Sequence, residues 1–193
     1  MPLCKPADFS LVNHLLLALG AMFLQQTFVA LARSLPAVIA PAIITDLKIA
    51  PAWVGVYFGM TAAASLVVQL GCGSFIVRYG ALRMSQIALV LVAAGTAIST
   101  LGTPWALIAS AIIAGGGGAV STPASSHLLA RCTTPKYLPL VFSIKQSGVP
   151  AGLAISGALL PWMLLQMSWP QALLWLGACI GLALLLIQPF RAT

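Results

Sequence analysis

Long apolar segments recur along the whole chain and constrain its fold more than any other feature. Between short breaks, the 193-residue sequence contains stretches of about 20 or more mostly apolar residues, which is the length that an α-helix needs to cross a membrane. Charged residues make up 6% of the chain and hydrophobic residues 61%, whereas a soluble domain carries roughly 25% charged residues. Most of the surface must therefore face lipid, and the sequence predicts an all-α integral membrane protein.

The breaks divide the chain into six predicted spans. Arg33 and Pro36 interrupt the first span, and the stretch from Pro41 to Ala52 is expected to be a loop. The first apolar stretch is too long for a signal-peptide core and lacks a clear cleavage site, so it is expected to be retained. The spans lie at about 11–40, 53–77, 84–101, 105–130, 139–165 and 171–188, and together form one transmembrane domain over residues 1–193.

The cations predict an orientation in the membrane. If the N-terminus is cytoplasmic, the outer loops contain only Lys48, beside Asp46. The cytoplasmic side then contains Lys5, Arg78, Arg83, Arg131, Lys136 and Arg191. This asymmetry follows the positive-inside rule, so both termini are expected in the cytoplasm and the protein in the plasma membrane (a bacterial inner membrane). The cations form no basic run, which argues against nucleic acid as a partner.

Polar side chains within four of the spans suggest a shared polar cavity. Gln26 and Arg33 are seven residues apart and so lie on one face of the first helix. Polar residues recur at steps of four from Tyr57 to Gln69 in the second span. The candidate substrate-binding residues in the first, second, fourth and fifth spans are Arg33, Lys145, Gln26, Tyr57, Gln69 and Ser121.

Arg33 and Lys145 are the two cations within spans, and no acidic residue lies in any span. A charge at the centre of a span costs about 2.5–3.5 kcal/mol on insertion scales, so it usually faces a cavity or a partner. The fork of an arginine suits a carboxylate or a similar anion. The alternatives are that Arg33 reaches outward or pairs with an acid on another part of the protein, and that Lys145 extends its stem to the interface.

The turn between the second and third spans carries a recognisable motif. It reads Gly-Ser-Phe-Ile-Val-Arg-Tyr-Gly-Ala-Leu-Arg and resembles the signature loop of the major facilitator superfamily, G-x-L-a-D-R-x-G-r-r. Gly73, Arg78, Gly80 and Arg83 carry the match, with Phe75 in the place of the leucine. The resemblance implies that this loop takes part in conformational change.

Two positions depart from the family pattern, and the fifth span adds to the likeness. Val77 stands where the family usually has Asp, and Ala111 stands near where the fourth span usually has Arg. In the family these two charges tend to interact, so losing both together is self-consistent.

The fifth span resembles the glycine- and proline-rich fifth helix of bacterial members, in which Gly148, Pro150 and Gly152 are expected to serve helix packing.

The resemblance covers nearly the whole chain but only half of a typical transporter. It implies two inverted three-helix repeats that form the N-terminal half of a twelve-helix fold. The expected function is secondary transport of small solutes by alternating access, as a symporter or uniporter, with a small organic or inorganic anion favoured. The expected partners are the lipid bilayer, the substrate, and a missing C-terminal half or a second six-helix half.

Other functions are weighed against the transporter. A truncated remnant or a membrane scaffold that does not transport stays open as the alternative. The spans contain no Gly-x-Ser-x-Gly, no His-Glu-x-x-His and no acid pair, so an intramembrane enzyme is not expected. The four cysteines have no paired spacing, and neither a metal site nor a cofactor is predicted.

Overall fold

The fold is entirely helical over the residues described by the computed structural model, which are 9–187, with side chains for 15–131 and 133–182. Five helical segments in this range are long and apolar enough to cross a membrane, and the last helix adds a shorter one. The elements are α1 (Phe9–Leu47), α2 (Ala52–Tyr79), α3 (Ala81–Ser99), α4 (Pro104–Cys132), the 3₁₀ turn η1 (Pro135–Tyr137), α5 (Leu138–Gln146), α6 (Gly148–Gln166) and α7 (Trp169–Ile187).

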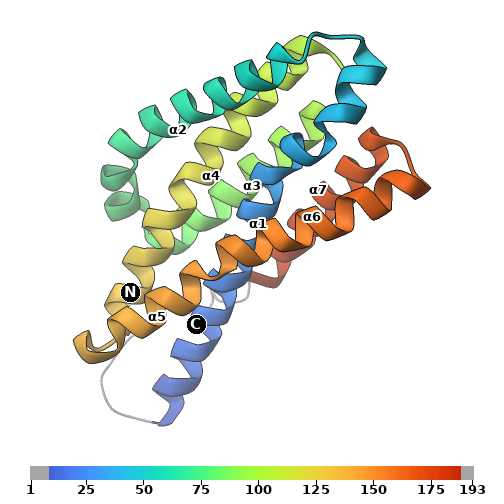
Figure 1. The fold of residues 1–193 in the computed structure, drawn as a ribbon. Coiled ribbons are helices and arrows are strands. Elements are labelled where there is room, and N and C mark those ends of the chain that lie inside the picture. The colour runs from blue at the N-terminus through green and yellow to red at the C-terminus, as the bar shows by residue number, and fades with distance from the viewer. Residues whose placement is uncertain (1–8, 188–193) are drawn as a thin grey trace.

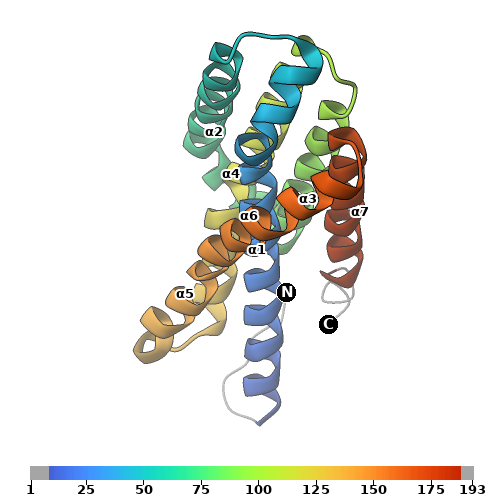
Figure 2. The ribbon, with the colours of Figure 1, turned by 45° about the vertical axis from the view of Figure 1, so that its right-hand side comes forward.

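Successive spans run in alternating directions through one elongated bundle (Figures 1 and 2). Helix α1 runs through the middle and contacts α4, α5, α6 and α7, while α2 and α3 pack closely on α4. Helix α7 lies at the edge, mainly against α3 (Figure 2). The α2–α3 and α4–α5 junctions lie toward one end, and the α1–α2, α3–α4 and α6–α7 junctions toward the other (Figure 1), as expected for a multi-span protein.

Helix α1 corrects the first predicted boundary. The loop expected from Pro41 does not begin there, because the helix continues through Pro36 and Pro41 to Leu47. A proline within a helix removes one backbone hydrogen bond. Transmembrane helices tolerate this where neighbouring helices, hydroxyl side chains or local adjustments satisfy the freed carbonyl four residues earlier.

The fifth predicted span is divided into two helices. Helix α5 ends at Gln146, Ser147 forms a turn, and α6 begins at Gly148. Pro150 gives the physical reason, because it has no N–H to donate to the carbonyl of Gln146 four residues earlier. The regular pattern resumes when Ala151 donates to the Ser147 carbonyl at 3.2 Å.

Four consecutive glycines let three helices approach α4 closely. A Cβ built at each position of Gly115–Gly118 in turn would lie 2.8, 3.2, 2.5 and 3.3 Å from an atom of Thr61, Val68, Leu91 and Val29. The first two neighbours belong to α2, the third to α3 and the fourth to α1. Because small residues allow helix backbones to approach closely in membranes, α1, α2 and α3 can all pack closely on α4.

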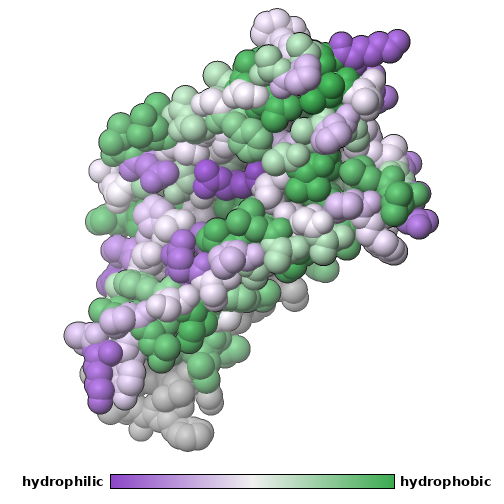
Figure 3. Space-filling model, in the orientation of Figure 1, coloured by the Kyte–Doolittle hydropathy of each residue, from purple (hydrophilic) through white to green (hydrophobic). Residues whose placement is uncertain are grey.

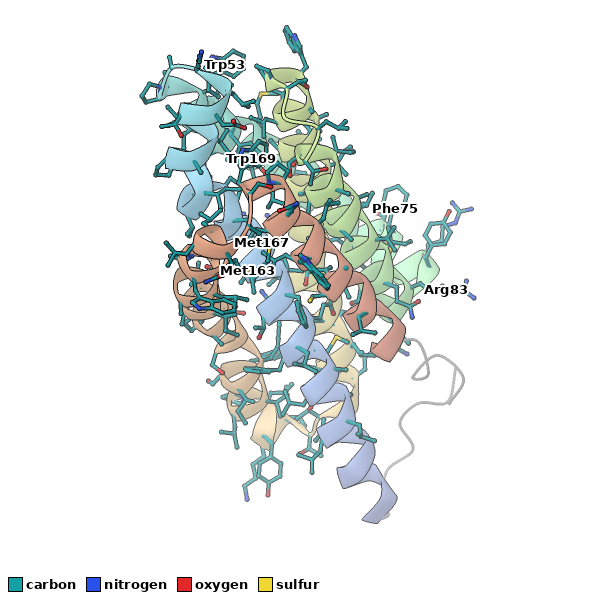
Figure 4. All side chains as sticks on the ribbon, turned by 90° about the vertical axis from the view of Figure 1, so that its right-hand side faces the viewer. Trp53, Phe75, Arg83, Met163, Met167 and Trp169 are labelled. Carbon is teal, nitrogen blue, oxygen red and sulfur yellow. The ribbon has the colours of Figure 1, made fainter. Side chains whose placement is uncertain are left out.

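A hydrogen bond links two helices at the α1–α2 end of the bundle. The indole nitrogen of Trp169 donates to the Asp46 carboxylate at 2.8 Å, which joins the last turn of α1 to the first turn of α7. Trp53 lies toward the same end, while Arg83 projects away from the bundle (Figure 4). Asp46 is therefore engaged at this end of the helix, far from the middle of the bundle.

Candidate functional site

A polar network connects α1, α4 and α5 within the bundle. The Gln26 amide nitrogen donates to the Thr122 hydroxyl at 3.2 Å, and the Ser121 hydroxyl lies 3.4 Å from the Gln26 amide oxygen, to which it donates. Gln26 and Ser121 are both buried. The structure thus brings two of the predicted site residues into direct contact, and the contact satisfies polar groups that would be costly to bury unpaired.

Lys145 enters this network from α5. Its side chain is only 2% exposed, and its ammonium donates to the Thr122 carbonyl at 3.2 Å and to the Ser126 hydroxyl at 2.9 Å. An ammonium has three N–H donors, so these contacts within the described residues use two of them. Both partners are neutral, so within the part of the chain that the structure describes the charge of Lys145 is solvated by α4 and has no balancing carboxylate.

Arg33 lies further along the same surface of α4. A Cβ at Gly118 would lie 3.5 Å from the Arg33 Cδ, so the arginine side chain passes directly over this glycine. Gly118 and Thr122 are four residues apart and occupy successive turns of one helix face, about 6 Å from each other. The side chains of Arg33 and Lys145 consequently contact one face of α4, the first at Gly118 and the second at Thr122 and Ser126, one to two helical turns away.

Arg33 has no acidic neighbour on its own helix. Asp46 lies about 20 Å further along α1 at 1.5 Å per residue and accepts the hydrogen bond of Trp169. The other acidic residue of the chain, Asp8, lies outside the described residues. The Arg33 side chain is exposed, and hydrophilic residues lie between α2 and α6 on the face of the molecule shown in Figure 3.

The polar stripe of α2 divides between two surroundings. Thr61 and Ser65 face α4, and the Ser65 hydroxyl donates to the Gly115 carbonyl at 3.0 Å. Tyr57 lines a small cavity near the α1–α2 end of the bundle, and Gln69 is exposed. A step of four residues advances a helix by 40° beyond a full turn, which is why one sequence stripe begins at the cavity and ends on the open surface.

Gln25 belongs to the network although the sequence analysis did not single it out. It is fully buried, and its amide nitrogen donates to the Ser121 hydroxyl at 3.1 Å and, more weakly, to the Ser85 carbonyl at 3.4 Å. A signal for it was present, because an amide in the middle of an apolar span needs a hydrogen-bond partner on another helix. Gln25 therefore holds Ser121 in place between α1 and α3.

The motif between α2 and α3 is a one-residue turn. Gly80 connects the two helices with φ 88° and ψ 145°, a conformation that is essentially restricted to glycine, and its N–H donates to the Ile76 carbonyl at 3.0 Å. The guanidinium of Arg78 lies 5.6 Å from the ring centre of Tyr79. Gly73 and Arg83 are exposed, so the motif presents a basic surface at the end of the bundle.

The small-residue face of α6 packs on α1. A Cβ at Gly148 would lie 2.8 Å from the Phe23 carbonyl oxygen, and one at Gly152 would overlap the Thr27 carbonyl oxygen. Pro150 is exposed; its contribution is the break between α5 and α6. Close packing of α6 on α1 fixes where α5 ends and so helps to place Lys145, in the last turn of α5, beside α4.

Comparison with known proteins identifies the family. A family model described as Major Facilitator Superfamily matches residues 22–191, which includes nearly all of the helices described above. The chain belongs to the major facilitator superfamily. No curated protein matches it.

Membership explains the general character of the molecule. A major facilitator protein is a multi-pass membrane transporter for small molecules, and about six apolar helices are consistent with half of that fold. The family match thus gives a general transporter function.

Proposed function

We propose that this chain carries a small anion across the membrane by alternating access, with Arg33 and Lys145 as the groups that attract it. The observation behind the proposal is that the side chains of two cations contact one face of α4, Arg33 at Gly118 and Lys145 at Thr122 and Ser126, while Asp46 is engaged elsewhere. Within a membrane such charges are expensive unless something compensates them, and a bound anion does so.

The two cations suit different parts of an anion. An arginine fork binds a carboxylate or phosphate through two parallel hydrogen bonds, whereas a lysine acts as a point charge. Lys145 is held by Thr122 and Ser126. It therefore contributes the electrostatic attraction of its ammonium and one further N–H donor. Arg33 is the more accessible of the two and is therefore assigned the direct contact with the substrate.

The exposed face of the bundle supports the proposal that a second unit packs against these helices. Only 17% of the residues in the apolar part of α2 are buried, against 61% in α4, and α2 and α6 flank the face that carries hydrophilic residues (Figure 3). We propose that a second six-helix unit covers this face and completes the cavity, and that the two units rock against each other to expose the site alternately.

The distribution of charge supports an orientation. Arg78 and Arg131 end α2 and α4, and Lys136 lies in η1 next to α5. The junctions that carry them lie toward the same end of the bundle (Figure 1). By the positive-inside rule we assign this end, and with it both termini, to the cytoplasm.

Uptake of radiolabelled small carboxylates into membrane vesicles tests the proposed function. Arg33→Gln and Lys145→Met are compared with wild type at equal abundance, with Gln146→Ala as control because this exposed polar residue adjoins Lys145. We expect Arg33→Gln to reduce uptake about 30-fold or more, since removing one partner of a charge pair costs roughly 2–5 kcal/mol. Wild-type uptake by Arg33→Gln would refute the role of Arg33, and absence of uptake by wild type would favour a scaffold that does not transport.

A further inference from the structure

A crevice between α1 and α2 lies beside the proposed anion site. It is bounded by Ile39, Ala40 and Ile43 of α1 and by Trp53 and Tyr57 of α2, with residues of α3, α4 and α7 behind it. Its volume of about 40 Å³ has room for about three water molecules at 10–15 Å³ each. The α1–α2 crevice is thus large enough for a short aliphatic group and too small for a sugar ring.

Two of the hydroxyl groups that line the crevice are already paired within the protein. Thr96 donates to the Val92 carbonyl at 2.8 Å, and Ser99 donates to the Thr96 carbonyl at 2.6 Å. Apart from these and the Tyr57 and Ser110 side chains, the lining residues are apolar. The crevice therefore suits an apolar ligand group better than a polar one.

The crevice and Arg33 lie next to each other along both α1 and α4. Ala114 lines the crevice and lies one turn, about 6 Å, from Gly118, over which the Arg33 side chain passes. On α1, Ala40 is seven residues beyond Arg33 and so shares its face. A cation at one end and an apolar pocket at the other are complementary to an amphipathic anion.

Resting on the proposed anion transport, we propose that the substrate is a short aliphatic monocarboxylate, with its carboxylate at Arg33 and its hydrocarbon part in the α1–α2 crevice. The Arg33 fork supplies the charge recognition, and the crevice supplies selectivity for the length and branching of the chain. Each methylene that enters an apolar site adds about 0.8 kcal/mol, which corresponds to roughly fourfold in affinity. Acetate would therefore bind more weakly than propionate, butyrate and isovalerate, until the crevice is full.

Equilibrium binding of this acid series to the 193-residue protein in lipid nanodiscs tests the proposal. Ala40→Leu fills the crevice, and Ala37→Leu is the matched control because Ala37 lies on the same helix, is exposed, and is not part of the crevice lining. We expect wild type and Ala37→Leu to bind each longer acid about fourfold more tightly. Ala40→Leu should bind acetate with the affinity of wild type, but its affinity should not increase with the chain length of the acid. Arg33→Gln should weaken all acids by a similar factor.

The outcomes separate this inference from the proposed function. An affinity independent of chain length in wild type, or a gain unchanged in Ala40→Leu, would overturn the crevice assignment while leaving an Arg33-dependent anion site intact. An affinity that keeps rising with chain length up to octanoate, equally in all variants, would indicate partition of the acids into lipid. That result would also overturn the crevice assignment. Arg33→Gln binding every acid as wild type does, or no binding by wild type, would overturn the anion site and the inference together.

Discussion

The packing of α6 on α1 predicts that two glycines on one helix respond oppositely to the same substitution. A methyl group at Gly152 would overlap the Thr27 carbonyl oxygen and lie 2.9 Å from both the Ala30 Cβ and the Leu31 nitrogen. Two of these atoms are backbone, so the contacts are relieved only if α6 moves away by more than about 1 Å, which restores normal separations of roughly 3.5–4.0 Å. At Gly157 an added Cβ has no neighbour within 4 Å.

The magnitude follows from comparing the two alanine variants. Both gain the same helix propensity of about 1 kcal/mol, so this contribution cancels between them. Overpacking typically costs 1–3 kcal/mol, and Gly152→Ala should therefore unfold at a midpoint roughly 2–12 °C below Gly157→Ala. Tryptophan fluorescence during heating in detergent measures this difference. Equal midpoints would refute the close contact between α1 and α6.

Three further predictions concern the ends of the bundle. Gly80→Ala should destabilise the protein by about 1–3 kcal/mol because of its positive φ, while Gly73→Ala, in open space within α2, should not; thermal unfolding that is equal for both would contradict this. Asp46→Ala should cost about 1.5–3 kcal/mol through the lost charged hydrogen bond, and Asp46→Asn less, as measured by the same unfolding assay. In a cysteine-free background, an impermeant thiol reagent should label Ala50→Cys from outside and not Thr134→Cys; both positions are exposed, so the reverse pattern would overturn the assigned orientation.

Local patterns in the sequence predicted the helices and one of their packing faces. In the fifth span, Gly148 and Gly152 were expected to serve helix packing, and both are buried against α1. Gly152 faces α1, and the Ser34 hydroxyl donates to Ser156 at 2.6 Å. Helical spacing is a local property, so a single sequence is enough to predict a shared face.

The features that sequence reasoning missed depend on contacts between helices. Pro41 predicted a loop because a proline weakens a helix. In the bundle, however, α1 continues through Pro41 to Leu47. The partners of Lys145 could not be predicted, since Thr122 and Ser126 resemble other hydroxyl residues of α4 until the helices are placed together. The α1–α2 crevice depends on five helices at once, and no single stripe indicates it.

The unequal lengths of the helices have a consequence for the surrounding lipid. Helices α3 and α7 have 19 residues each, about 28 Å, which just spans a hydrocarbon core of about 30 Å. Helices α2 and α4 have 28 and 29 residues, about 42 and 44 Å, so they must tilt or extend into the headgroups. The short pair fixes the depth of the protein in the bilayer, and the long pair carries Arg78 and Arg131 in its last turns to the level of the phosphates. The thickness of the bilayer thereby acts on the tilt of α2 and α4, two helices that border the α1–α2 crevice and the proposed anion site.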